Sequence, residues 1–172
     1  NSILKVNGSF KKNKNIELKL ISLKDDNNNF FEINNLKIDQ KFKINTFDKL
    51  VFTFSNNNKI QNKISLTRNK KKYKVYGKSF DASKLLDQVL NTNNKKQSSA
   101  LFSKLDSTFK IDIDKLYFDK TTYVNDFVGN IKFVDNELNS LNLDSSFFNK
   151  KKLTLTIKTN DNKEKITTLF SG

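Results

Sequence analysis

The stretch FKIDIDKL, residues 109–116, sets the pattern of the whole chain. Phe109, Ile111 and Ile113 alternate with charged residues. A period of two residues places the apolar side chains on one face of a β-strand and the charged side chains on the other. This stretch therefore predicts an amphipathic strand.

The same alternation recurs on both sides of this stretch, with turns rich in Asn, Asp and Lys between the runs. A spacing of roughly 8–12 residues between runs is typical of antiparallel all-β architecture. About a dozen strands are predicted, within residues 1–77 and 107–170. The apolar pairs that mark them include Phe31 with Ile33, Leu36 with Ile38, Phe42 with Ile44, Ile64 with Leu66, Tyr73 with Val75, Ile131 with Phe133, Leu141 with Leu143, and Ile166 with Phe170.

One segment departs from the alternation. From Phe80 to about residue 91, the apolar residues Leu85, Leu86, Val89 and Leu90 fall on one face of a helix. Ser79 or Asp81 is a suitable N-terminal cap, and a carboxylate there also favours the positive end of the helix dipole. The sequence predicts an amphipathic helix over about 80–91 and an exposed, mobile loop over 91–99.

The composition argues against an enzyme. The chain has no His and no Cys, so it lacks imidazole bases, thiol nucleophiles, disulfides and the usual zinc ligands. Its four glycines form no phosphate-binding loop. Asp112 and Asp114 share one face of a strand, where they could serve acid–base chemistry or bind Ca²⁺. They are better interpreted as its polar face, and Asp25-Asp26 as part of a turn. We expect no catalytic residue, metal or cofactor.

The net charge of +14 is compatible with nucleic acid or an anionic membrane as a partner. Only Arg68 among the 32 basic residues is Arg, whereas phosphate recognition favours the bidentate guanidinium. The runs 41–43 and 131–133 alternate Lys with Phe, but adjacent residues of a strand face opposite sides of the sheet. A base stacked on the Phe would not meet the Lys, so no nucleic acid is expected.

The chain contains no Met and no run of 18 apolar residues. We expect residues 1–172 to be a single segment of a larger protein, with any membrane anchor outside this segment.

A family resemblance rests on the block Gly77-Lys78-Ser79-Phe80-Asp81-Ala82-Ser83-Lys84-Leu85-Leu86. It resembles a signature of the AsmA-like superfamily of bacterial envelope proteins, the YhdP and TamB kind. In that family a strand ends in Gly, a Ser-(Leu/Phe)-Asp stretch opens a helix, and new strands follow. Residues 109–116 and 130–138 are similar to the next strands, and residues 153–172 to the closing hairpin.

The resemblance implies a long, twisted antiparallel sheet that is curled into an open groove. It further implies the periplasmic body of a protein that is anchored in the inner membrane of a Gram-negative cell. Phospholipid would pass between the inner and outer membranes with its acyl chains against the groove.

The alternation itself leaves two functions open, because a lipid-facing row and a buried core row require the same pattern. The alternative to a lipid conduit is a structural or adhesive surface β-domain with a closed core and no ligand. If there is a groove, its expected lining is Leu4, Val6, Phe10, Ile16, Leu18, Phe52, Phe54, Ile111, Ile113, Leu153, Leu155 and Ile157.

Overall fold

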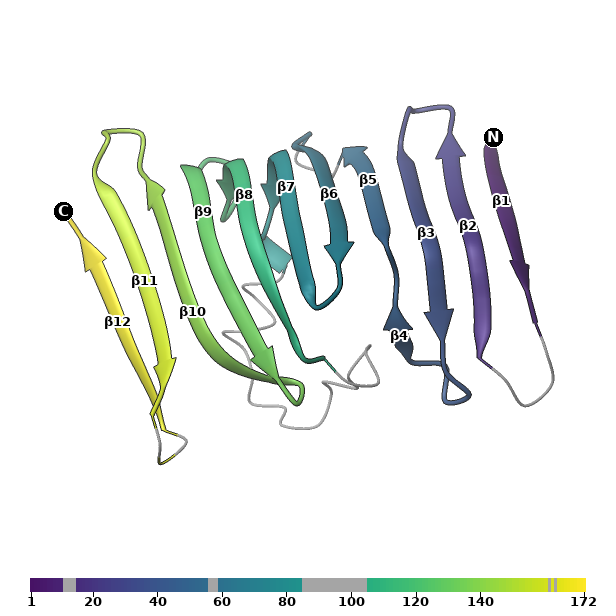
Figure 1. Ribbon diagram of the computed structural model, residues 1–172. Helices are drawn as coiled ribbons and strands as arrows, with labels where there is room; N and C mark the ends of the chain where they lie inside the picture. Colours follow the sequence, from purple (N-terminus) through teal and green to yellow (C-terminus); the bar gives the residue numbers. More distant parts are fainter. Residues whose placement is uncertain (11–14, 56–58, 85–104, 161, 163) are drawn as a thin grey trace.

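The computed structural model describes residues 1–10, 15–55, 59–84, 105–160, 162 and 164–172. These residues form one sheet of twelve strands (Figure 1). The mainly β fold expected from the sequence is confirmed. The strands are β1 (Ser2–Ser9), β2 (Ile16–Asp25), β3 (Phe30–Ile38), β4 (Ile44–Thr46), β5 (Lys49–Ser55), β6 (Gln61–Asn69), β7 (Lys72–Asp81), β8 (Ser107–Tyr117), β9 (Tyr123–Val134), β10 (Glu137–Ser146), β11 (Lys152–Thr159) and β12 (Lys165–Ser171).

The strands follow one another across the sheet in chain order, and the short β4 pairs with β3 beside this path. The sheet does not close, so β1 and β12 are its two edges. Every neighbouring pair is antiparallel except β7 and β8, which are parallel. The expectation of a wholly antiparallel sheet is therefore wrong. A hairpin cannot join parallel strands, and β8 begins at the same end of the sheet as β7, with Lys72 opposite Thr108.

The helix expected from residue 80 does not begin there. Phe80 and Asp81 belong to β7, where they pair with Leu116 and Tyr117 of β8. The backbone N–H of Ala82 extends this pairing by donating to the Tyr117 carbonyl at 2.8 Å. Residues 85–91 of the expected helix, with Leu85 and Leu86, and the expected mobile loop over 91–99 lie outside the described residues. The structure therefore does not show the amphipathic helix.

One row of paired residues crosses the whole sheet, and we call it the central row. All its members are apolar side chains except for one glycine. At about 4.8 Å between neighbouring strands, its ten steps span roughly 48 Å. It consists of Val6, Ile21, Ile33, Leu50, Leu66, Val75, Ile111, Gly129, Leu143, Leu155 and Leu169.

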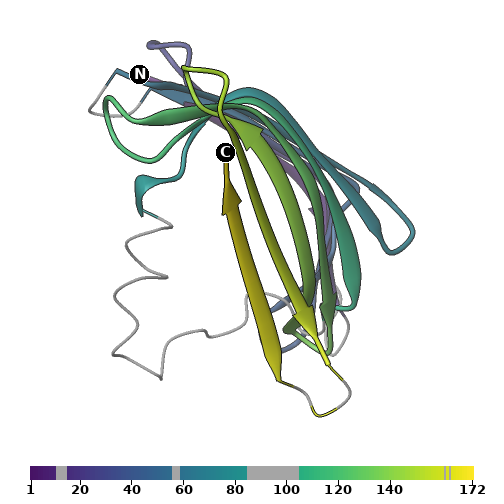
Figure 2. The same ribbon diagram turned by 90° about the vertical axis from the view of Figure 1, so that its left-hand side faces the viewer.

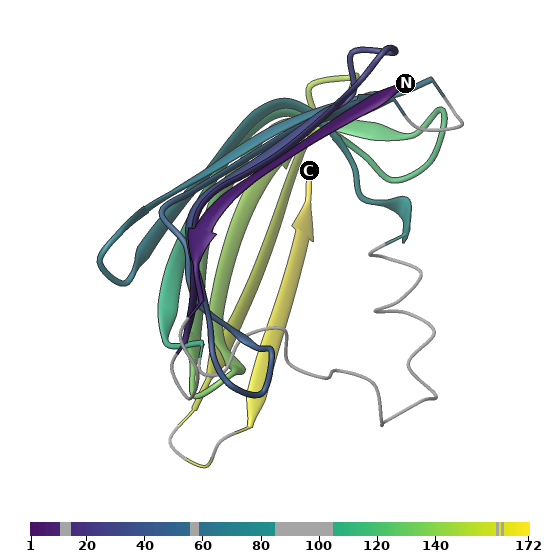
Figure 3. The same ribbon diagram turned by 90° about the vertical axis from the view of Figure 1, so that its right-hand side faces the viewer.

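The sheet is curved, and the chain leaves β7 on its concave side (Figures 2 and 3). Ala82, the first residue after β7, is buried in an apolar cluster with Ile64, Ile111 and Ile113. A second cluster, around Ile33, shares Leu66 with the first. Both clusters draw on the central row, which thus lies on the concave face.

The apolar face keeps its register although two strands contain a left-handed residue. Asn35 in β3 has φ 52° and Asp126 in β9 has φ 51°. Asn and Asp adopt this conformation more readily than most residues with a side chain. The apolar residues on either side of Asn35, Ile33 and Leu36, are three apart and are buried in the same cluster. A left-handed residue therefore compensates for a slip in the alternation.

Candidate functional site

The concave face contains an apolar cavity of ≈ 380 Å³ at the centre of the sheet. Strands β5 to β9 and the residue after β7 supply its walls. Every lining residue is apolar: Phe52, Ile64, Leu66, Val75, Phe80, Ala82, Ile111, Ile113, Leu116 and Phe127.

A β-bulge in β7 directs Phe80 into this cavity. The register between β6 and β7 shifts at Ile64, which pairs with Gly77, while Lys63 pairs with Ser79. A Cβ atom at Gly77 would overlap the Lys63 carbonyl oxygen, so only glycine fits. The Ser79 hydroxyl donates to the Gln61 carbonyl. The residues of the motif up to Asp81 thus shape the end of a strand rather than the start of a helix.

Phe80 is close to Phe52 in the cavity wall, and their ring centroids lie 6.2 Å apart in an edge-to-face arrangement. Edge-to-face pairs at this distance are favourable. This contact fixes one side of the cavity.

Gly129 occupies the one position of the central row without a side chain. An added Cβ atom would meet the Asn142 carbonyl oxygen and would lie 2.8 Å from the Leu143 Cδ2 atom. The apolar surface of the central row therefore has a dip at Gly129, between the side chains of its cross-strand partners Ile111 and Leu143.

An aromatic ladder forms the end of the apolar face that is nearer to the start of β7. Phe47 lies 5.4 Å from Tyr73, and Tyr73 stacks on Phe109 at 4.8 Å between ring centroids. Phe109 contacts Phe133 edge-on at 5.8 Å. Burial raises the pKa of the Tyr73 phenol, so this side chain stays neutral at physiological pH.

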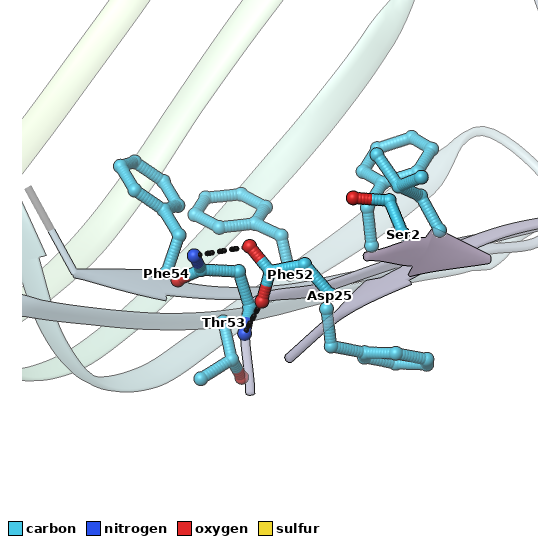
Figure 4. Close-up of a pocket in the computed structure, with 9 residues that line it drawn as sticks. Ser2, Asp25, Phe52, Thr53 and Phe54 are labelled. Atoms are coloured by element: carbon cyan, nitrogen blue, oxygen red, sulfur yellow. Dashed lines mark hydrogen bonds between the residues drawn. The ribbon is translucent and has the colours of Figure 1, made fainter. Parts of the chain in front are cut away.

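A second cavity, of ≈ 310 Å³, lies at the opposite end of the sheet and is lined by residues of β1, β2, β3 and β5 and by Asn29 in the turn between β2 and β3. Phe52 lines both cavities. Figure 4 shows the Phe52 and Phe54 rings on one side of β5 and Thr53 on the other. Asp25, at the wall of this cavity, accepts hydrogen bonds from the Asn29 backbone and side-chain nitrogens at 2.8 and 2.7 Å. The hydrogen bond from the Asn29 side chain is the main reason that the pKa of Asp25 is lowered.

Eleven of the residues expected to line a groove lie on this apolar face. Phe10 does not, because it follows the end of β1 and is 73% exposed. That the eleven contact lipid stays a prediction. They are Leu4, Val6, Ile16, Leu18, Phe52, Phe54, Ile111, Ile113, Leu153, Leu155 and Ile157.

Sequence reasoning missed other residues of the face. Ile64 and Leu66 mark a predicted strand but were not assigned to the groove, although their alternation is as regular as that of Ile111. Phe127 lies three residues after Val124 in β9, and Leu116 lies three residues after Ile113 in β8. A period of two would put the members of each pair on opposite faces, so alternation alone does not place Phe127 or Leu116 on the concave face. A spacing of three residues around an Asn or Asp is the signal that would have found Phe127.

Most side chains of the convex face are polar, although the apolar residues Ile3, Val128 and Phe170 also lie there. Lys49, Lys74 and Lys110 lie in one cross-strand row that passes through Thr67. In β8 the two carboxylates Asp112 and Asp114 are exposed, whereas the alternating residues Ile111 and Ile113 are buried, as the sequence pattern predicts. Lys132 is exposed and Phe133 is half-buried, so this pair also faces opposite sides.

Phe42 was expected in a strand but lies in a turn with φ 59° and is 81% exposed. Its N–H donates to the Asp39 carbonyl at 3.0 Å, which closes the turn. The alternation of 42 with 44 therefore marks a turn and the start of β4.

Among the residues that the structure describes, no helix has the length and apolar character needed to cross a membrane. Comparison with known proteins adds no relative: no family model, no curated protein and no solved structure matches the chain.

Proposed function

We propose that this chain is a segment of a lipid-transfer protein whose concave apolar face carries phospholipid acyl chains between the inner and outer membranes. The observation that carries the proposal is the central row, which is apolar across an open sheet of eleven successive strands. Apolar patches of more than a few hundred Å² rarely stay exposed on monomers, so a face of this kind needs an apolar ligand or partner.

The dimensions of the face suit a conduit better than a single binding pocket. One acyl chain occupies about half of a ~30 Å hydrocarbon core, or roughly 15 Å. The central row, at roughly 48 Å, is about three times as long. Chains lying along it would pass from one strand to the next without leaving apolar surface.

The alternative of a closed core is less well supported. The described residues form a single sheet, and no second sheet within them covers the apolar face. Exposure also increases outward along the central row: Ile111 is 9% exposed, whereas Val6 and Leu169 at the edges are 57% and 66% exposed. A sandwich would bury such positions.

The resemblance of residues 77–86 to the AsmA-like superfamily supports the same proposal and supplies the setting. On this view the chain belongs to the periplasmic body of an inner-membrane-anchored protein. The lysines of the convex face would then lie away from the acyl chains, where charged groups stay hydrated.

Lipid extraction and probe binding test the proposal. The purified chain should carry phospholipid that mass spectrometry detects in an organic extract, and the lipid-stripped chain should take up a fluorescent acyl probe. A chain that retains no phospholipid and takes up no probe would contradict the proposed function.

A further inference from the structure

Two β-bulges flank β8, one in each neighbouring strand. In β7 the extra residue is Lys78, which lies between Gly77 and Ser79 at the register shift. In β9 the left-handed Asp126 lies at a second register shift, where β10 has one residue fewer. Bulges bend a strand, redirect its side chains and are over-represented next to active sites. The sheet is therefore irregular on both sides of β8, at the level of Asp114.

The two bulges contribute to one open cavity of ≈ 660 Å³ on the convex face, because Lys78 and Asp126 both line it. Asp114 and Lys115 of β8 lie between them in its wall. The Ser146 hydroxyl of β10 also lines the cavity and donates to Asp126 Oδ2 at 3.2 Å. An adjoining cavity of ≈ 440 Å³ shares Lys78 and Asp114 in its wall. Two adjoining cavities suit an extended ligand.

The larger cavity contains charges of both signs. Its wall includes the ammonium groups of Lys78, Lys115 and Lys150 and the carboxylates of Asp114 and Asp126. None of these groups forms an ion pair with another residue that the structure describes. An anionic ligand would meet the carboxylates and a cationic ligand the ammonium groups, and both contacts are repulsive. The mixture therefore suits an uncharged ligand with hydroxyl groups, which both donate and accept hydrogen bonds.

Aromatic rings border both cavities. Phe148 lines the larger cavity and is 85% exposed, in a turn that the Lys150 N–H closes by donating to the Phe147 carbonyl at 2.9 Å. Tyr117 lines the same cavity, and Tyr76 lines the adjoining one. A sugar ring carries hydroxyl groups on its edge and C–H groups on its faces. Its edge can bond to the polar wall while a face packs on an aromatic ring, whose own face is apolar.

We propose that these adjoining cavities bind a neutral oligosaccharide. Its hydroxyl groups bond to Lys78, Asp114 and Asp126, and one sugar face packs on Phe148. The strands that line the site, from β5 to β10, all lie inside the sheet. A nucleic acid fits less well, because the two carboxylates would repel its phosphates. This inference goes beyond the proposed function, since the site is on the face opposite the acyl path and needs no lipid.

Isothermal titration calorimetry tests the site with three neutral hexasaccharides: cellohexaose, maltohexaose and the hexamer of N-acetylglucosamine. At least one should bind to the purified, lipid-free chain. Its Kd should hardly change when the salt concentration is raised, because the ligand carries no charge. A single-stranded oligonucleotide is the comparison. Any binding of the oligonucleotide through the lysines should weaken steeply with salt.

Matched substitutions locate the binding. Phe148→Ala should weaken it roughly tenfold, since covering a phenylalanine ring contributes about that much. Phe42→Ala, which removes a similarly exposed ring from another turn, should bind as the wild type does.

Lys78→Ala should weaken binding several-fold. Lys110→Ala removes the same charge from the convex face outside both cavities and should have no effect. Failure of all three hexasaccharides to bind, binding of the oligonucleotide alone, or equal losses from Lys78→Ala and Lys110→Ala would overturn the proposal.

Discussion

The side-chain oxygen Oδ1 of Asn62 accepts a hydrogen bond from the backbone N–H of Asp81 at 2.7 Å. Asn62 is in β6 and is fully buried, whereas Asp81 is the last residue of β7. The Asn62 amide nitrogen also donates to the carbonyls of Phe54 and Ile60, each at 3.4 Å. This side chain therefore ties the end of β7 to its neighbours and holds Phe80 at the cavity.

Replacing Asn62 with leucine should destabilise the fold. The Asp81 N–H would lose its side-chain acceptor, and an unsatisfied buried donor costs about 1–3 kcal/mol. We expect Asn62→Leu to lower the free energy of unfolding by that amount in urea denaturation. Asn142→Leu, at an exposed position of β10, is the control and should change it little. Equal stability of Asn62→Leu and the wild type would show that the hydrogen bond does not hold this strand end.

A side chain at Gly129 should also destabilise the sheet. The new methyl group of Gly129→Ala would overlap the Asn142 carbonyl, and forcing atoms into a packed site costs about 1–3 kcal/mol. Thermal denaturation should show a clear fall in the melting temperature. The neighbouring Asn130→Ala, on the exposed face of β9, should leave the melting temperature almost unchanged. If both variants melt alike, the close approach at Gly129 is not a constraint.

The turn at Asp119 predicts a defined pH dependence. Hydrogen bonds from the backbone of Thr121 and Thr122, both at 2.7 Å, hold the pKa of Asp119 well below its ordinary value of 3.8. Because the folded-state pKa is depressed, this carboxylate stabilises the fold above pH 3.8 and loses that effect as the pH falls toward the folded-state pKa.

Asp119→Asn should therefore be less stable than the wild type near neutral pH, and the difference should shrink on acidification below pH 4. Urea denaturation at a series of pH values measures it. Asp112→Asn, on the convex face of β8, is the control. A difference that stays constant down to the lowest pH would contradict the assignment.

Glutamate substitutions at two adjacent residues of β1 distinguish the concave face from the convex face. Leu4 and Ile3 are almost equally exposed, at 63% and 61%, but Leu4 lies on the concave face and Ile3 on the convex face. Leu4→Glu places a charge beside the proposed acyl path and should weaken uptake of a fluorescent acyl probe several-fold, since a buried charge is costly. Ile3→Glu should bind the probe as the wild type does, and equal losses would argue against a face-specific site.

Alternation along the sequence was sufficient to predict the strands and the face on which most of their side chains lie. Ile111 and Ile113 on one side, with Asp112 and Asp114 on the other, follow directly from a period of two. Phe127 could not be placed in this way, because the left-handed Asp126 changes which face the following residues occupy.

The parallel pairing of β7 with β8 was not predictable from local pattern either. It depends on the end of the sheet at which β8 begins, which no periodicity encodes. Phe80 and Asp81 were assigned to a helix because Ser and Asp suit a helix cap. In the structure Asn62, far away in sequence, holds them in β7 instead.

Photo-crosslinking at adjacent residues of β9 tests the central claim most directly. Phe127 lines the concave cavity, whereas its neighbour Val128 is 39% exposed on the convex face. A photoreactive phenylalanine analogue is placed at one position or the other, and the chain is irradiated in the presence of phospholipid vesicles. The account predicts a phospholipid adduct by mass spectrometry at 127 and none at 128. Equal labelling at both positions, or none at 127 in a folded protein, would contradict it.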